Sequence, residues 1–171
     1  MKICLFPGSF DPPTLGHMDI IARCSHLFNK VVVGVLNNNS KRPLFPSEER
    51  VDLLKNLYKD CPQIEVQSFS GLTVHLAKQV GAQAIIRGLR SSDDLGYEQT
   101  MARLNAQLDG DIETVMLLTD HRYSHISSSM VKEIAYYGGN INDMVDFSIV
   151  SRVRSRMIVK RAEDIRINER S

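Results

Sequence analysis

Short apolar segments alternate along the chain with longer segments in which apolar positions recur every three or four residues. The apolar runs are short and rich in β-branched residues, which is typical of buried β-strands. Because they are almost continuously apolar rather than strictly alternating, they favour a parallel sheet that is covered on both faces. The predicted strands are Lys2–Phe6, Val31–Leu36, Ile64–Gln67, Ala84–Ile86 and Thr114–Leu118.

The segments between these strands have the period of amphipathic helices. Ser47 can cap one of them, and Glu48 and Glu49 follow in its first turn, where acidic side chains interact favourably with the helix dipole. The strict alternation predicts an α/β fold with right-handed crossovers. The predicted helices are His17–Phe28, one that begins at Ser47, Thr73–Val80, Leu95–Leu108 with apolar positions Met101, Leu104 and Leu108, and Ser127–Tyr137 with Met130, Ile134 and Tyr137.

Length and composition are those of a single soluble domain. The 171 residues are 43% hydrophobic and 24% charged, and the net charge of +1 argues against a nucleic-acid partner. No apolar run approaches the roughly 20 residues of a membrane span, so no membrane contact is expected. The three cysteines lie far apart and form no CxxC pair, which favours a cytoplasmic location without zinc or disulfides.

The C-terminal end differs from the rest in charge. Residues 151–171 hold seven basic and three acidic residues, so the first 150 residues are slightly acidic. Val150, Val153 and Met157 share one helical face, which predicts a terminal helix that packs on the body. An anionic ligand must therefore be attracted by local groups of the body rather than by its overall field.

Phosphate-binding features follow three of the predicted strands, and ligands of parallel α/β sheets bind at the carboxyl ends of strands. After the first strand, Gly8 permits a tight turn and Gly16-His17 opens a helix, whose free N–H groups attract phosphate. Arg87 and Arg90 follow the fourth strand, and guanidinium groups suit multidentate phosphate contacts. After the fifth strand, three serines, 127–129, run into a helix start.

Each feature also has an ordinary structural explanation: a tight turn, surface salt bridges, and helix capping. Asp11 is expected to shape its own turn through side-chain hydrogen bonds. The loop after the second strand adds Ser40, Lys41 and Arg42 at the same edge of the sheet. Taken together, these groups predict a nucleotide-phosphate site.

Four motifs, in this order and spacing, resemble bacterial phosphopantetheine adenylyltransferase: G-S-F-D-P-P-T-L-G-H, S-K-R, I-R-G-L-R and I-S-S-S-M-V-K-E. The resemblance implies a Rossmann-like, doubly wound, parallel five-stranded sheet with helices on both faces. It covers a single nucleotidyltransferase domain, 1–158, that includes the C-terminal helix and precedes a basic tail, 159–171. The implied reaction transfers the adenylyl group of ATP to 4′-phosphopantetheine and gives dephospho-coenzyme A and pyrophosphate, in the penultimate step of coenzyme A biosynthesis.

The resemblance further implies Mg²⁺ held mainly through the ATP phosphates, a homohexamer, and feedback inhibition by coenzyme A. It assigns catalytic roles to His17, as the transition-state stabiliser, and to Lys41 and Arg90. Because no cluster of carboxylates marks a metal site in the sequence, we expect no protein ligand for the metal. Phosphopantetheine is expected to contact Ser9, Lys41, Thr73 and Arg87. ATP is expected to contact Ser9, Phe10, His17, Gly88, Leu89, Arg90, Glu98, Tyr123, Ser124, His125, Ile126, Ser127, Ser128 and Ser129. Ser9 replaces the threonine that is more usual in the family and keeps its hydroxyl.

The expected mechanism is direct in-line attack without a covalent intermediate. A phosphate monoester has a second pKa of about 6, so the nucleophile is largely dianionic at neutral pH and needs no general base. Two alternatives stay open: transfer to another acceptor, such as nicotinate mononucleotide, or of a cytidylyl group, and a nucleotide or coenzyme A sensor without turnover. Thr14, Lys41 and the I-R-G-L-R run argue against the first, and the joint presence of His17, Lys41, Arg87 and Arg90 argues against the second.

Overall fold

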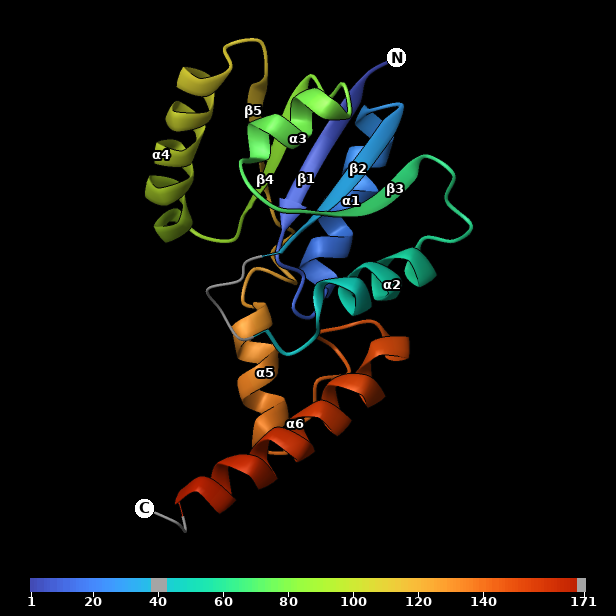
Figure 1. The fold of residues 1–171 in the computed structure, drawn as a ribbon, viewed down its shortest axis with the longest axis vertical. Coiled ribbons are helices and arrows are strands. Elements are labelled where there is room, and N and C mark those ends of the chain that lie inside the picture. Colours follow the sequence, from blue (N-terminus) through green and yellow to red (C-terminus); the bar gives the residue numbers. More distant parts are fainter. Residues whose placement is uncertain (38–42, 169–171) are drawn as a thin grey trace.

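Five parallel strands form one sheet in the order β3-β2-β1-β4-β5 in the computed structural model, which describes residues 1–37 and 43–168 (Figure 1). The strands are β1 (Ile3–Gly8), β2 (Lys30–Leu36), β3 (Ile64–Phe69), β4 (Ala84–Leu89) and β5 (Glu113–Leu118). The helices are α1 (Leu15–Leu27), α2 (Ser47–Leu57), α3 (Thr73–Gln79), α4 (Ser92–Leu108), α5 (Ser128–Tyr136) and α6 (Phe147–Asn168). All predicted strands and helices are confirmed, with ends shifted by a few residues.

Alternate residues of the strands pack on opposite faces of the sheet. Cys4 and Phe6 of β1 join a cluster with residues of α1 and α2, whereas Leu5 joins a cluster with residues of α3. α4 contacts α3 and the strands β4 and β5 on that second side (Figure 1). The predicted doubly wound sheet with helices on both faces is therefore confirmed.

The sheet opens at the carboxyl ends of β1 and β4. β1 pairs with β2 over its whole length, from Ile3 to Gly8. With β4 it pairs only at two positions, where Cys4 meets Ala84 and Leu5 meets Ile85. The order of the strands reverses at this point, because the chain leaves β1 toward β2 and later returns on the other side as β4. Such a switch point leaves a crevice for a ligand.

α5 and α6 lie beyond this edge of the sheet and pack against each other (Figure 1). A third apolar cluster joins them to the start of α2, through Phe45 and Leu53. Val150, Val153 and Met157 of α6 are buried in it, so the predicted inner face of the terminal helix is confirmed. α6 continues to Asn168 and crosses the predicted boundary between 158 and 159, and that division of the chain stays a prediction.

The apolar positions from which α4 and α5 were predicted are buried only in part. Leu104 and Leu108 of α4 are exposed, and the buried residues of this helix are the polar Glu98 and Asn105. Met130 and Tyr137 are likewise exposed, and α5 buries Val131 and Ala135 instead. None of the helices in the described ranges combines the length and the apolar character that crossing a membrane requires.

Candidate active site

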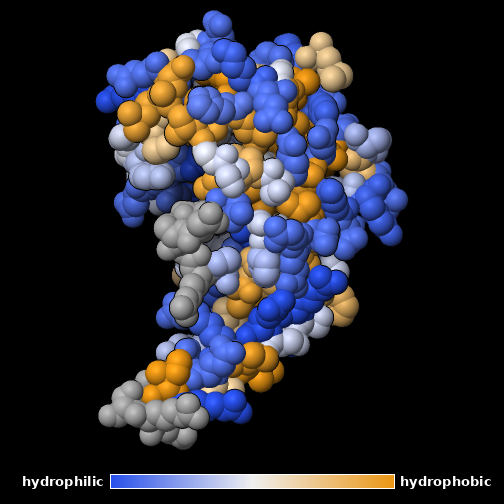
Figure 2. Space-filling model, in the orientation of Figure 1, coloured by the Kyte–Doolittle hydropathy of each residue, from blue (hydrophilic) through white to orange (hydrophobic). Residues whose placement is uncertain are grey.

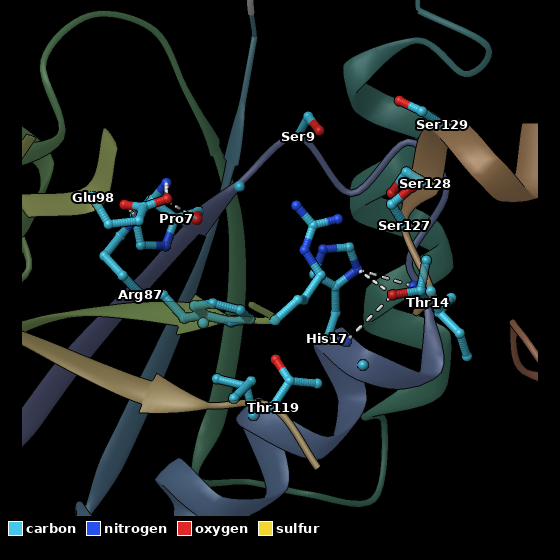
Figure 3. A pocket seen from close by; sticks show the side chains of 17 residues that line it. Pro7, Ser9, Thr14, His17, Arg87, Glu98, Thr119, Ser127, Ser128 and Ser129 are labelled. Atoms are coloured by element: carbon cyan, nitrogen blue, oxygen red, sulfur yellow. Dashed lines mark hydrogen bonds and ion pairs between the residues drawn. The ribbon is translucent and has the colours of Figure 1, made fainter. Parts of the chain in front are cut away.

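A cavity of about 290 Å³ lies at the opening between β1 and β4 (Figure 3). Its lining comes from five parts of the chain that are distant in sequence. They are the end of β1 and its loop (Phe6, Pro7, Gly8, Ser9), the start of α1 (Thr14, Gly16, His17, Ile20), the end of β4 with α4 (Arg87, Gly88, Arg90, Glu98), Thr119 after β5, and the start of α5 (Ile126, Ser127, Ser128, Ser129).

His17 is held in one orientation by the cap of its own helix. Thr14 is the N-cap of α1, and its hydroxyl accepts the backbone N–H of His17 at 3.4 Å. In return, the backbone N–H of Thr14 donates to Nδ1 of His17 at 3.0 Å. Because Nδ1 accepts this bond, the neutral ring carries its proton on Nε2. The ring therefore offers one N–H donor for a ligand.

The imidazole of His17 is neutral at physiological pH. Burial, with a smaller contribution from the positive charge of Arg90, lowers its pKa to about 4. Figure 3 shows the ring between the Arg87–Glu98 pair on one side and the three serines on the other. His17 can thus stabilise negative charge through a hydrogen bond without adding a full positive charge to the cavity.

Phe10 supports His17 from the side of the core. Its side chain is fully buried, and its ring centre lies 5.0 Å from that of His17 in an edge-to-face arrangement. A β-carbon on Gly8 would lie 3.0 Å from the Phe10 ring, so a larger residue at position 8 would force this ring to shift. Phe10 does not line the cavity, and its predicted contact with ATP stays a prediction.

Arg87 and Glu98 form a two-point ion pair at one wall of the cavity. Nε and Nη2 of Arg87 donate to the Glu98 carboxylate at 2.5 and 2.6 Å, and Nη1 lies 3.4 Å from the Pro7 carbonyl oxygen. Glu98 is buried, so the pair holds the guanidinium plane in one orientation. Arg87, which we expected to bind phosphopantetheine, is therefore in direct contact with Glu98, which we expected to bind ATP.

Arg90 is held in the same way by Asp94, four residues further along. The Asp94 carboxylate accepts from Nε and Nη2 of Arg90 at 3.1 and 3.0 Å, and from the Arg90 backbone N–H at 3.0 Å. The hydrogen bond from the Arg90 side chain is the main reason that the pKa of Asp94 is lowered. Our sequence analysis missed Asp94, although its spacing of four residues from Arg90 was a usable signal.

The start of α5 forms the opposite wall. Ser127 is the N-cap, and its hydroxyl accepts the backbone N–H of Met130 at 3.1 Å. The hydroxyl of Ser128 donates to the carbonyl oxygen of Pro12 at 2.8 Å. N–H groups in the first turn of a helix have no partner within the helix, and they bind anions well.

The structure brings together most of the predicted site residues. Those that line the cavity are Ser9, His17, Arg87, Gly88, Arg90, Glu98, Ile126, Ser127, Ser128 and Ser129. Those that do not are Phe10, Thr73, Leu89, Tyr123, Ser124 and His125, and their predicted contacts stay predictions. Lys41, with Ser40 and Arg42, lies outside the described residues. Thr119 was missed, although it directly follows a predicted strand.

The described residues include no group of three histidine, cysteine, aspartate or glutamate side chains that could hold a metal ion. Glu98, which lines the cavity, and Asp94, which holds Arg90, are each engaged by an arginine.

The chain matches proteins of known family over almost all of its length. Residues 5–134 match the cytidylyltransferase-like family. The phosphopantetheine adenylyltransferase of Lachnoclostridium phytofermentans is 50% identical over 163 residues, which are 95% of this chain and all of that protein. The chain belongs to the phosphopantetheine adenylyltransferase family. The enzyme of that name from Caldanaerobacter subterraneus subsp. tengcongensis is 47% identical over 91% of this chain and 98% of its own length.

A solved structure outside this family shares the fold. The nicotinic acid mononucleotide adenylyltransferase of Plasmodium falciparum superposes with a TM-score of 0.65 over 95% of this chain and 97% of that chain, at 15% sequence identity. Its likeness supports the Rossmann-like α/β assignment and carries no information on the acceptor.

The lowered pKa of His17 makes the stability of the fold depend on pH. Below about pH 6.5 the unfolded chain binds a proton at this position, whereas the folded chain does so only near pH 4. The free energy of unfolding should therefore fall with decreasing pH between these values, by up to about 3 kcal/mol from this group. Urea unfolding of the wild type and of His17→Gln should show a flatter pH dependence in the variant.

The matched control is His26→Gln, which removes an exposed imidazole from the same helix. A variant at position 17 whose unfolding free energy has the same pH slope as the wild type would contradict the neutral state of His17.

Proposed function

We propose that this protein transfers the adenylyl group of ATP to the phosphate of 4′-phosphopantetheine, which gives dephospho-coenzyme A and pyrophosphate. The main support is that three phosphate-binding elements meet around one cavity: the loop and helix start after β1, the arginines after β4, and the start of α5. The names of the relatives that match the chain over almost its full length support phosphopantetheine as the acceptor.

The acceptor phosphate attacks the α-phosphorus of ATP directly. One of its oxygens forms a bond to that phosphorus while the bond from phosphorus to the pyrophosphate oxygen breaks, so no covalent enzyme intermediate is needed. Arg87, in the orientation set by Glu98, holds the attacking phosphate, and we assign Lys41 to the same task. The protein lowers the barrier by alignment and by charge stabilisation rather than by proton transfer.

His17 and the opposite wall act on ATP. The Nε2–H of the neutral His17 donates to the α-phosphate, on which charge accumulates in the transition state. Arg90 and the first turn of α5 bind the leaving pyrophosphate. Because Asp94 and Glu98 are already paired, we propose that Mg²⁺ would be held mainly by the ATP phosphates, where it would offset part of their negative charge.

The direct test is the release of pyrophosphate from ATP and magnesium with a series of acceptors. Release should require 4′-phosphopantetheine and should not occur with nicotinate mononucleotide, and added coenzyme A should slow it. Release of pyrophosphate only with another acceptor would contradict the proposal and favour an enzyme that acts on that acceptor. ATP binding without release for any acceptor would favour the sensor.

Two variants should separate the roles in this assay. His17→Ala should lower kcat on the order of 100-fold, because one transition-state donor is lost, with a much smaller change in ATP affinity. Arg87→Ala should mainly raise the KM for the acceptor. The control is Arg154→Ala, on α6, where the arginine donates to the side chains of Asn140 and Asn142. Equal losses of kcat and ATP affinity in His17→Ala would assign His17 to ground-state binding.

We also propose that the protein is a cytoplasmic homohexamer. Its three cysteines are free, which fits a reducing compartment. Large apolar side chains of α4 and β5 are exposed, among them Tyr97 (64%) and Leu118 (70%) together with Leu104 and Leu108. Figure 2 shows apolar side chains gathered at the upper left, over α4. Exposed apolar patches of this kind are typical of protein interfaces.

Light scattering should therefore give a mass six times the 19.3 kDa of one chain. Leu104→Glu should lower the mass and leave the helix content unchanged, because it places a charge in the proposed interface. Leu27→Glu, at an exposed apolar position on α1, is the control. A wild-type mass equal to one chain would contradict the hexamer.

A further inference from the structure

The start of α5 binds phosphate in the proposed reaction, but α5 does not lie on either face of the sheet. Its main helical neighbour is α6, and the two form a separate layer beyond the carboxyl ends of the strands (Figure 1). The apolar cluster that contains Phe45 and Leu53 joins this layer to α2. The place of the serines relative to His17 depends in addition on contacts between α5 and the loop after β1.

Two polar contacts connect α5 to the loop that follows β1. The hydroxyl of Ser128 donates to the Pro12 carbonyl oxygen at 2.8 Å, and Nζ of Lys132 lies 3.1 Å from Oδ2 of Asp11. Residues four apart lie on the same face of a helix, so Ser128 and Lys132 face this loop on successive turns. One contact would only attach α5 to the loop. Two contacts on successive turns also fix the rotation of α5 about its own axis.

Asp11 is held in place to pair with Lys132. The carboxylate is buried, with 5% of the residue exposed, and it accepts the backbone N–H groups of Leu44 and Phe45 at 2.9 Å each. It therefore connects three segments: the loop after β1, the segment before α2, and α5. We expected Asp11 to shape its own turn, and the structure adds partners that lie 33 to 121 residues away.

Lys132 is the ion-pair partner of Asp11 within the described part of the chain. The other cation beneath this loop, Arg50, donates to the carbonyl oxygens of Ser9, Leu36 and Phe45 and not to the Asp11 carboxylate. Loss of Lys132 removes the ion-pair partner of a buried carboxylate and leaves the electrostatic attraction of Arg50 and two backbone N–H groups as its compensation, which favours a displacement of α5 or of the loop.

We propose that Lys132 is a positioning residue for ATP: its ion pair with Asp11 sets the place of the α5 serines relative to His17. Lys132 does not line the cavity and so acts through α5. A displacement of about 1 Å in a phosphate-binding element can cost on the order of 100-fold in rate. The proposal deepens the proposed function, on which it rests, by naming what aligns its two ATP-binding walls.

The test compares Lys132→Met and the milder Lys132→Gln with a matched control, Lys30→Met. Lys30 forms an ion pair with Glu65 and does not line the cavity. The side chain of Lys30 is 32% exposed, and that of Lys132 is 30% exposed. ATP affinity is measured by titration calorimetry without acceptor, well below the melting temperature. Both Lys132 variants should bind ATP about tenfold more weakly or worse, and Lys30→Met should bind it as the wild type does.

Lys132→Arg should restore most of the ATP affinity, because it keeps the charge and reaches the same carboxylate. In the pyrophosphate assay, the KM for ATP should rise in Lys132→Met and the KM for the acceptor should stay near the wild-type value. A Lys132→Met protein with a lower melting temperature but unchanged ATP affinity would overturn the proposal, because the pair would then serve stability alone. The titration with ATP contains no acceptor, so its result does not depend on which acceptor the enzyme uses. Failure of the proposed reaction would be seen in the pyrophosphate assay instead.

Discussion

The candidate site depends on the separation of β1 and β4. The two strands are hydrogen-bonded only around Cys4–Ala84 and Leu5–Ile85, and beyond these pairs their carboxyl ends diverge. Every group at the cavity occupies this gap or its rim, and the loops after β1, β4 and β5 reach it from different sides. If β1 and β4 were paired to their ends, backbone hydrogen bonds would close the space that the phosphates need. The strand order is therefore the first requirement for the chemistry.

The candidate site, which we propose to bind anions, has little net charge of its own. Arg87 and Arg90 are each paired with a carboxylate of α4, and His17 is neutral because burial lowers its pKa. Phosphate recognition thus relies on oriented N–H donors more than on total charge. This arrangement fits the net charge of +1 of the chain, because a protein that attracted ATP through a general positive field would carry a larger positive charge. It also keeps the donors in place before the substrate arrives, so that little reorganisation is needed during the reaction.

The sequence was sufficient to predict the order of the helices and strands and most of the residues that line the cavity. Apolar runs predicted the strands, and the rule that ligands sit beyond strand ends led to His17, Arg87, Arg90 and the serines 127–129. Ser9 was assigned through the family resemblance. The sequence was not sufficient for contacts between distant segments. Asp11 reaches Leu44 and Lys132, which no local pattern indicates. The outward face of α4 was equally hidden, because helical period alone does not show whether an apolar stripe meets the sheet or is left exposed.

The most direct test of direct in-line transfer is the stereochemistry at the α-phosphorus. ATP with one α-phosphate oxygen replaced by sulfur, in a single configuration, is converted with 4′-phosphopantetheine, and the configuration of the resulting thio-substituted dephospho-coenzyme A is determined. A single displacement, aligned by Arg87 and stabilised by His17, predicts inversion. Retention would require two successive displacements through a covalent intermediate and would contradict the mechanism.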